Sequence, residues 1–216
     1  MKTLVYFGIF SLMLAKLSAV VGETSLGIEF GEASFKHKVL GNSSFDWEVE
    51  GTVWELGANF NIKDSSDYGL DLALDFYYGE PDSDEVQATL SKFDFALRPF
   101  MKFNGLILFA EVGYSRFHSE VDEEDFFSGR SVVPTVGAQF SSNNVTFSPS
   151  VDYVDYGLQA EGFIFSLPLH YSLNENFDVF IRYSRTAFDD YTHDDFIYQE
   201  NDFQTVSFGF DLRFSK

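Results

Sequence analysis

The segment from Asp189 to Asp195 concentrates groups that exchange protons and bind cations. A single histidine, His193, stands among the four carboxylates of Asp189, Asp190, Asp194 and Asp195. Carboxylates beside a histidine can activate a water molecule for hydrolysis. The same oxygens suit Ca²⁺ or Mg²⁺, and a plain solvated acidic loop is the third interpretation. The four acids are therefore weak candidate metal ligands.

A second acidic segment begins at His118-Ser119-Glu120. A serine hydrolase would need a serine placed against a histidine, and no spacing selects one of the four histidines for that role. We therefore predict no catalytic residues and no cofactor, with bound Ca²⁺ or Mg²⁺ at the acidic segments as the alternative. The further weak metal candidates here are Asp122, Glu123, Glu124 and Asp125.

The elements that must position these groups are strands. Apolar residues occupy every second position in many segments, which is the period of a strand with one apolar face. An Asn104-Gly105 pair between two such segments is the strongest hairpin signal in the chain. Eight segments show the pattern clearly: 26–30, 52–62, 68–78, 93–103, 106–114, 163–171, 177–183 and 206–214.

The region 130–156 decides the number of strands. Read as a hairpin around Ser141 to Asn144 it gives ten strands, and read as a loop it leaves eight. A loop of about 40 residues would be far longer than usual. We predict ten strands, with eight as the alternative; both counts are even, as in bacterial single-chain barrels.

The last alternating segment, Val206 to Phe214, carries a motif. Its pattern of polar residue, glycine, apolar residue and aromatic residue resembles the C-terminal signal of bacterial outer-membrane β-barrel proteins, although Ser215 and Lys216 follow where that signal usually ends. The resemblance is to small barrels of the outer-membrane protein A-like, X-like and W-like kind. It implies an all-β, closed, antiparallel up-and-down transmembrane barrel and a barrel-assembly machinery as partner. The assembly-signal residues are Ser207, Gly209, Leu212 and Phe214.

The N-terminus has the layout of a secretory signal peptide, with Lys2 before an apolar run and small residues at 18–19. We expect cleavage after Ala19, or as late as Gly22, which leaves residues 20–216 as one barrel domain in the outer membrane. There is no cysteine, so a disulfide or thiolate site is excluded. The net charge of −20 disfavours nucleic acid as a partner.

Which face points outward sets the chemistry of the interior. A soluble lipocalin-like barrel would turn its apolar face inward, whereas the C-terminal signal, the secretory start and aromatic residues at strand ends favour lipid outside. Charges enclosed in a narrow barrel are expected to pair. We predict a polar, salt-bridged lumen formed by Glu55, Asp71, Asp75, Asp94, Arg98, Glu111, Asp152, Arg182, Asp211 and Arg213.

The connections alternate between short and long along the chain. Short turns are predicted at 63–67, 104–105, 141–144 and 172–176, on the periplasmic side with both termini. Mostly longer, acidic external loops are predicted at 36–46, 79–89, 118–129 and 188–202, with a short one near 155–156.

We expect a non-enzymatic envelope barrel with a structural, adhesive or cation-binding role. Its expected partners are outer-membrane lipid and lipopolysaccharide, whose phosphates the acidic loops would reach through divalent cations. The alternative is a narrow channel or transporter for small solutes. A lipid hydrolase is less expected, and so is a protease with an acid and histidine site resembling that of the omptins, which are ten-stranded barrels. The sequence does not predict the oligomeric state.

Overall fold

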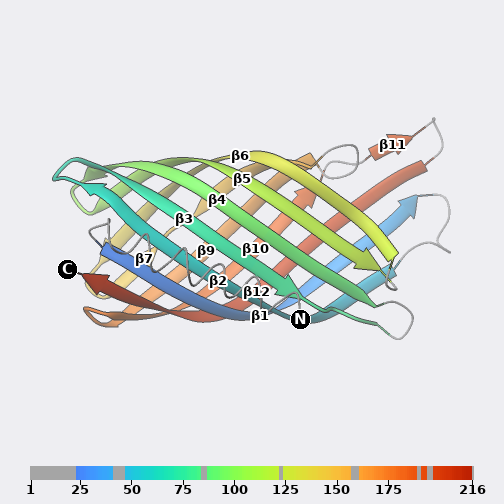
Figure 1. Cartoon of the computed structure of the whole chain (residues 1–216), viewed down its shortest axis with the longest axis horizontal. Coiled ribbons are helices and arrows are strands. Elements are labelled where there is room, and N and C mark those ends of the chain that lie inside the picture. Colours follow the sequence, from blue (N-terminus) through green and yellow to red (C-terminus); the bar gives the residue numbers. More distant parts are fainter. Residues whose placement is uncertain are drawn as a thin grey trace.

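The alternating segments form one closed antiparallel barrel in the computed structural model (Figure 1). The structure describes residues 23–40, 47–83, 87–121, 124–156, 161–188, 191–193 and 197–215. The predicted signal peptide lies outside these residues, so its cleavage stays a prediction. No helix among the described residues is long and apolar enough to span a membrane.

Twelve strand segments make up the described part of the sheet. They form ten full strands around the barrel wall, each of which is here called a stave. β7 and β8 are two parts of one stave, and β11 is a short strand that pairs only with β12. The segments are β1 (Glu23–Leu40), β2 (Trp47–Asp64), β3 (Tyr68–Gly79), β4 (Ala88–Phe103), β5 (Leu106–Val121), β6 (Glu124–Ser142), β7 (Val145–Phe147), β8 (Ser150–Asp155), β9 (Glu161–Asn174), β10 (Phe177–Phe188), β11 (Tyr191–His193) and β12 (Ile197–Ser215).

The barrel closes because its first and last long strands pair. β1 and β12 are antiparallel along their whole shared length, from Glu23 opposite Ser215 to Leu40 opposite Tyr198. Closure leaves no edge of unpaired backbone groups, which a spanning sheet in lipid requires. The prediction of a ten-stranded closed barrel is confirmed. The break between β7 and β8 falls at Pro149, which has no backbone N–H to donate to a ladder.

The short turns lie at the barrel end that carries both ends of the described chain, here called the turn end (Figure 1). Asn104 and Gly105 have φ values of 44° and 87°. Two successive positive φ values are the mark of a type I′ hairpin turn, which asparagine and glycine adopt at low cost. Asn143, with φ of 52°, begins the corresponding turn between β6 and β7. Both predicted hairpins are therefore present.

The opposite end, here called the loop end, differs from the prediction. Much of the predicted external loops is strand: β1 runs to Leu40, β5 runs to Val121 and β6 begins at Glu124. The outward residues of these extensions whose side chains are described, such as Ser34, Arg116 and Arg130, are polar, so the apolar alternation that marks a lipid-facing strand stops earlier than the hydrogen-bonded ladder. The strands therefore project beyond the apolar belt on this side.

The apolar face points outward. Val112, Val132 and Val136 expose 62%, 67% and 63% of their surface, whereas Thr135 in the same strands' inner row exposes 5%. A barrel that encloses its polar residues and presents valine, leucine and phenylalanine outside matches a lipid-facing surface. The alternative of a soluble barrel with an apolar interior face does not match this orientation.

Candidate functional site

The barrel interior contains a cavity of about 690 Å³. The structure places all ten charged residues predicted for the lumen on its wall, because each has the inward parity of its strand. Their role as a sealed core stays a prediction. The structure adds seven carboxylate, lysine or histidine side chains to the cavity wall that the sequence analysis did not assign to the lumen: Glu23, Glu29, Asp64, Lys92, Lys102, His170 and Asp178.

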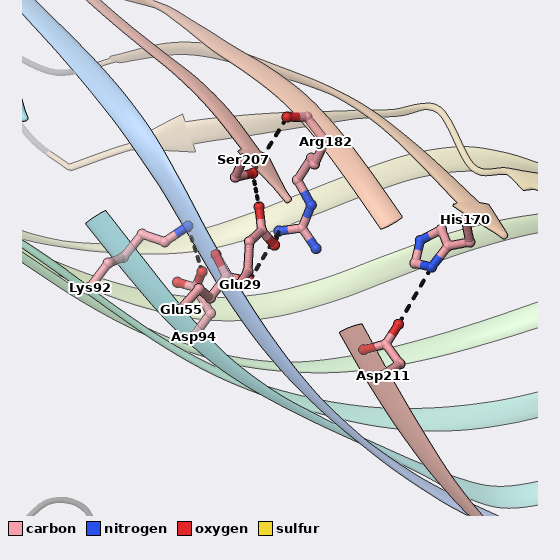
Figure 2. Close-up of polar contacts among 8 residues, drawn as sticks. All are labelled: Glu29, Glu55, Lys92, Asp94, His170, Arg182, Ser207 and Asp211. Carbon is pink, nitrogen blue, oxygen red and sulfur yellow. Dashed lines mark hydrogen bonds and ion pairs between the residues drawn. The ribbon is translucent and has the colours of Figure 1, made fainter. Parts of the chain in front are cut away.

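Arg182 of β10 is the centre of the largest ionic group. Its Nη1 lies 3.1 Å from Glu29 Oε2 and 3.0 Å from Glu55 Oε1, and the Ser207 hydroxyl donates to the Glu29 carboxylate (Figure 2). Glu29 and Glu55 are direct neighbours across β1 and β2. Like charges placed opposite each other destabilise a sheet, so Arg182 neutralises a repulsion that the fold itself creates.

A second pair of opposed acids lies beside this group. Asp75 of β3 and Asp94 of β4 are register partners, and Lys92 Nζ lies 2.7 Å from Asp94 Oδ2 (Figure 2). We call Glu29, Glu55, Asp75, Lys92, Asp94 and Arg182 the central charge cluster. It holds four acids and two cations. The ion pairs therefore leave the cluster with more carboxylates than cations.

Two further polar groups lie between the central charge cluster and the turn end. Arg98 Nε donates to Glu111 Oε2 at 2.7 Å, and its guanidinium lies 4.9 Å from the centre of the Phe109 ring. Asn61 Nδ2 donates to Asp71 Oδ1 at 2.8 Å. The Arg98 side chain is thus held against the wall by its ion pair and by the Phe109 ring, and Asn61 satisfies one oxygen of the Asp71 carboxylate.

His170, Asp178 and Asp211 form a group that can hold a metal ion. Each offers a ligand atom, and these atoms lie within 4.8 Å of one another. His170 Nδ1 lies 3.4 Å from Asp211 Oδ2 (Figure 2), and Arg213 binds Asp178. Imidazole and carboxylate ligands suit Zn²⁺ among other ions. The Asp178 carboxylate, however, already forms an ion pair with Arg213. A cation there would compete with Arg213.

The loop-end half of the lumen is lined by apolar side chains. Buried residues from β1, β2, β3 and β4 pack with Phe117 and Phe203. Phe117 also packs, with Val133 of β6 and Ile164 of β9, against the buried pair Val154 and Tyr156. Where a strand carries inward charges, these residues lie on the loop-end side of them, although in β5 and β6 the inward Ser119 and Ser131 lie farther toward the loop end. We call this set the apolar plug: Ala33, Val53, Tyr77, Leu90, Phe117, Val133, Val154, Tyr156, Ile164 and Phe203.

The apolar plug is not predicted by the sequence analysis, which gives the lumen as polar and salt-bridged. The signal was present in the parity: Val53, Tyr77 and Leu90 share the inward parity of Glu55, Asp75 and Lys92. Tyr77 and Phe203 are edge-on at 6.1 Å, and Phe117 and Tyr156 lie 5.8 Å apart by ring centroids. Val53 and Leu90 expose 2% and 1% of their surface. All ten residues of the set except Ala33 also line the cavity.

The cavity wall is strongly acidic. Among the described residues that line it, eleven are carboxylates and five are lysine or arginine, an excess of six acids with His170 counted as neutral. Excess charge of one sign in a low-dielectric enclosure concentrates counter-ions. The cavity is therefore a place where cations accumulate.

The predicted acidic loop sites are not part of this interior. Asp122, Glu123, Asp189, Asp190, Asp194 and Asp195 lie outside the described residues, and Glu124 and Asp125 begin β6 without described side chains. The prediction of Ca²⁺ or Mg²⁺ at these acids therefore stays a prediction. His118 and Ser119 are successive residues of β5, of which Ser119 lines the cavity. Alternation sends their side chains to opposite faces, so they do not form a nucleophile and base pair.

The assembly-signal residues all lie in β12, the strand that closes the barrel. Ser207 and Gly209 face inward, whereas Leu212 and Phe214 expose 40% and 52% of their surface on the outer face. Gly209 has a packing reason: a Cβ atom there would lie 2.5 Å from the Ile28 carbonyl oxygen and 2.5 Å from Phe180 Cζ. Only glycine lets β1 and the Phe180 ring approach β12 this closely.

Gly209→Ala is therefore expected to impair closure of the barrel. We expect a loss of about 1–3 kcal/mol, the usual cost of overpacking, and a lower refolding yield in lipid vesicles, measured by heat-modifiable migration on a gel. Gly113→Ala is the matched control, because a Cβ there would meet its nearest atoms, Ala96 Cβ and the Phe95 carbonyl oxygen, at 3.2 and 3.3 Å, well beyond the 2.5 Å contacts at Gly209. Equal yields for the two variants would contradict the packing role of Gly209.

A closed antiparallel barrel with an apolar outer belt and a charged interior is the fold of bacterial outer-membrane β-barrel proteins. The chain is similar in structure to the outer-membrane protease OmpT from Escherichia coli, with a TM-score of 0.53, 11% identity, and coverage of 89% of this chain and 96% of that one. It is also similar to the translocator domain of the autotransporter NalP from Neisseria meningitidis, with a TM-score of 0.51, 10% identity, and coverage of 97% and 98%.

Neisserial surface protein A matches with a TM-score of 0.45 and 11% identity over 88% of this chain and 97% of that one. At these identities the likeness concerns the fold alone. No protein-family model matches the chain, and no curated protein matches its sequence. The chain thus has the outer-membrane β-barrel fold, and its function has to be argued from its own side chains.

Proposed function

We propose that this protein is a non-enzymatic barrel of the bacterial outer membrane whose lumen is closed to solutes. Its role would be structural, adhesive or cation-binding, exercised through its projecting strands and acidic interior. The observation that carries the proposal is the apolar plug, in which side chains from nine of the ten staves meet across the loop-end half of the lumen. Water and ions would cross an apolar layer of this kind poorly, because a charge transferred into it loses its hydration.

Membrane placement is supported by the outer face and its dimensions. On β5 the outward apolar row runs from Leu106 to Tyr114, which spans about 27 Å along the strand at about 3.4 Å per residue. With the usual tilt of about 40° this corresponds to about 20 Å of height, close to the apolar band of about 25 Å that such barrels present to lipid. Polar residues follow in both strand directions.

Planar-bilayer recording of the purified wild-type protein tests the proposal. We expect no discrete current steps after insertion, because the apolar plug interrupts the aqueous path. Co-flotation of the protein with lipid vesicles shows that it has inserted. Reproducible single-channel steps from the wild-type protein would contradict the closed-lumen function.

A narrow cation channel is the second candidate. It is favoured by the cavity of about 690 Å³ and by the excess of six carboxylates on its wall. On this alternative the apolar plug would be a gate that opens. Reversal-potential measurements would then show selectivity for cations over anions, because the fixed negative charge excludes anions.

A further inference from the structure

Two arginines face each other on the outside of the barrel, just beyond the apolar belt. Arg116 of β5 and Arg130 of β6 are direct register partners. Both are exposed, and both have the outward parity of Tyr114 and Val132, which are the register pair immediately toward the turn end. Side chains opposed in this way have Cβ atoms about 4.5–5.5 Å apart, so one small group can contact both guanidinium groups.

Neither arginine is neutralised by an acid within the described part of the chain. Other outward cations beyond the belt are paired: Lys36 Nζ lies 2.5 Å from Glu48 Oε1, and Arg185 Nη2 lies 2.8 Å from Asp202 Oδ2. Arg116 and Arg130 make no such contact with a described acid. In a chain with a net charge of −20, two adjacent unpaired arginines form a local positive site.

Opposed like charges destabilise a sheet unless an ion of opposite charge lies between them. Phosphate suits this pair, since arginine presents planar N–H groups that bind its oxygens in parallel. We propose that Arg116 and Arg130 bind the phosphate of a membrane lipid in the leaflet at the loop end of the barrel. This inference rests on the membrane placement proposed above and adds a ligand to it.

The position of the site selects a lipid over a soluble anion. Both arginines follow five successive outward positions of the belt, from Leu106 to Tyr114 on β5 and from Phe140 to Val132 on β6. One further outward step along a strand is about 7 Å, which places the guanidinium groups at the level of lipid headgroups. Phe93 lies beside Arg116 in the register with β4 and exposes 39% of its surface, so an acyl chain can pack below the phosphate.

Native mass spectrometry of the detergent-solubilised barrel, titrated with phosphatidic acid, tests the site. We expect the wild-type protein to retain one phosphatidic acid. The double variant Arg116→Gln/Arg130→Gln should bind it at least about tenfold more weakly, because two charge-assisted contacts are lost. The matched control is Lys36→Gln/Arg185→Gln, which removes two outward cations that are already paired, and it should bind as the wild type does.

The outcomes separate the possible sources of the phosphate. Diacylglycerol, which has the acyl chains without the phosphate, should not be retained, and excess inorganic phosphate should displace phosphatidic acid only weakly. Equal retention by the wild type and the Arg116/Arg130 variant would overturn the site, and equal competition by inorganic phosphate would overturn the lipid as its ligand. A protein that fails to enter micelles would instead refute the membrane placement itself.

Discussion

Truncation of the apolar plug should turn a silent barrel into a cation-conducting one. Phe117 packs against both apolar groups that form the proposed closure of the lumen. Its replacement in Phe117→Ala, alone and combined with Tyr77→Ala, removes the aromatic rings that separate the acidic cavity from the loop end. We expect discrete current steps in planar bilayers, larger for the double variant and selective for cations, because the exposed path is lined by an excess of carboxylates.

The control for this experiment is Phe163→Ala, which makes the same truncation on the outer face, where Phe163 exposes 46% of its surface. It should leave the membrane silent. Each large-to-small change in a packed interior costs about 3–5 kcal/mol, so heat-modifiable migration must first show that the variants are folded. Folded double variants that stay silent would mean that the closure lies elsewhere than in the apolar plug.

Loss of Arg182 is expected to have the largest effect on stability of any single charge in the lumen. Arg182→Met leaves Glu29 and Glu55 opposed without a cation between them (Figure 2). Breaking a buried ionic group in this way typically costs about 3–5 kcal/mol. Urea-induced unfolding in lipid vesicles should show this loss at neutral pH. The loss should shrink on acidification, because protonated carboxyl groups no longer repel one another.

Two variants separate this effect from general damage. Arg185→Met removes an arginine that pairs with Asp202 on the outer face, where its side chain is half exposed, and should cost no more than about 1 kcal/mol. Arg182→Met combined with Glu29→Gln and Glu55→Gln should regain much of the lost stability, because no unpaired charge is left. A triple variant as unstable as Arg182→Met would show that packing, not charge, is the reason.

The period-two pattern was sufficient to predict the fold. Alternation in segments such as 106–114, together with the Asn104-Gly105 turn, predicts the strands, their order and which side chains share a face; the C-terminal signal then indicates which face points outward. The region 130–156, whose alternation is weak, forms part of β6 and the stave of β7 and β8. The break of that stave at Pro149 explains why its pattern is the hardest to recognise. Strand ends were predicted poorly, because beyond the belt both faces carry polar residues and the pattern vanishes.

The interior was predicted only in part, for a physical reason. Parity assigns Glu55, Asp75 and Arg182 to the lumen, but the distances that join them depend on the stagger of the strands around the barrel. Stagger also decides that Phe117 meets residues from both sides of the lumen. The same holds for Arg116 and Arg130, which lie 14 residues apart and become neighbours only through the β5–β6 register.

Lipid quenching at single introduced cysteines tests the central claim most directly, because the chain has no cysteine of its own. A fluorophore attached at Val136→Cys, on the outer face, should be quenched by brominated lipid, whereas one at Thr135→Cys, on the inner face, should not. Val112→Cys and Gly113→Cys repeat the comparison on β5. Strong quenching at the inner positions with none at the outer ones would contradict an apolar face turned toward hydrocarbon around a closed, charged interior.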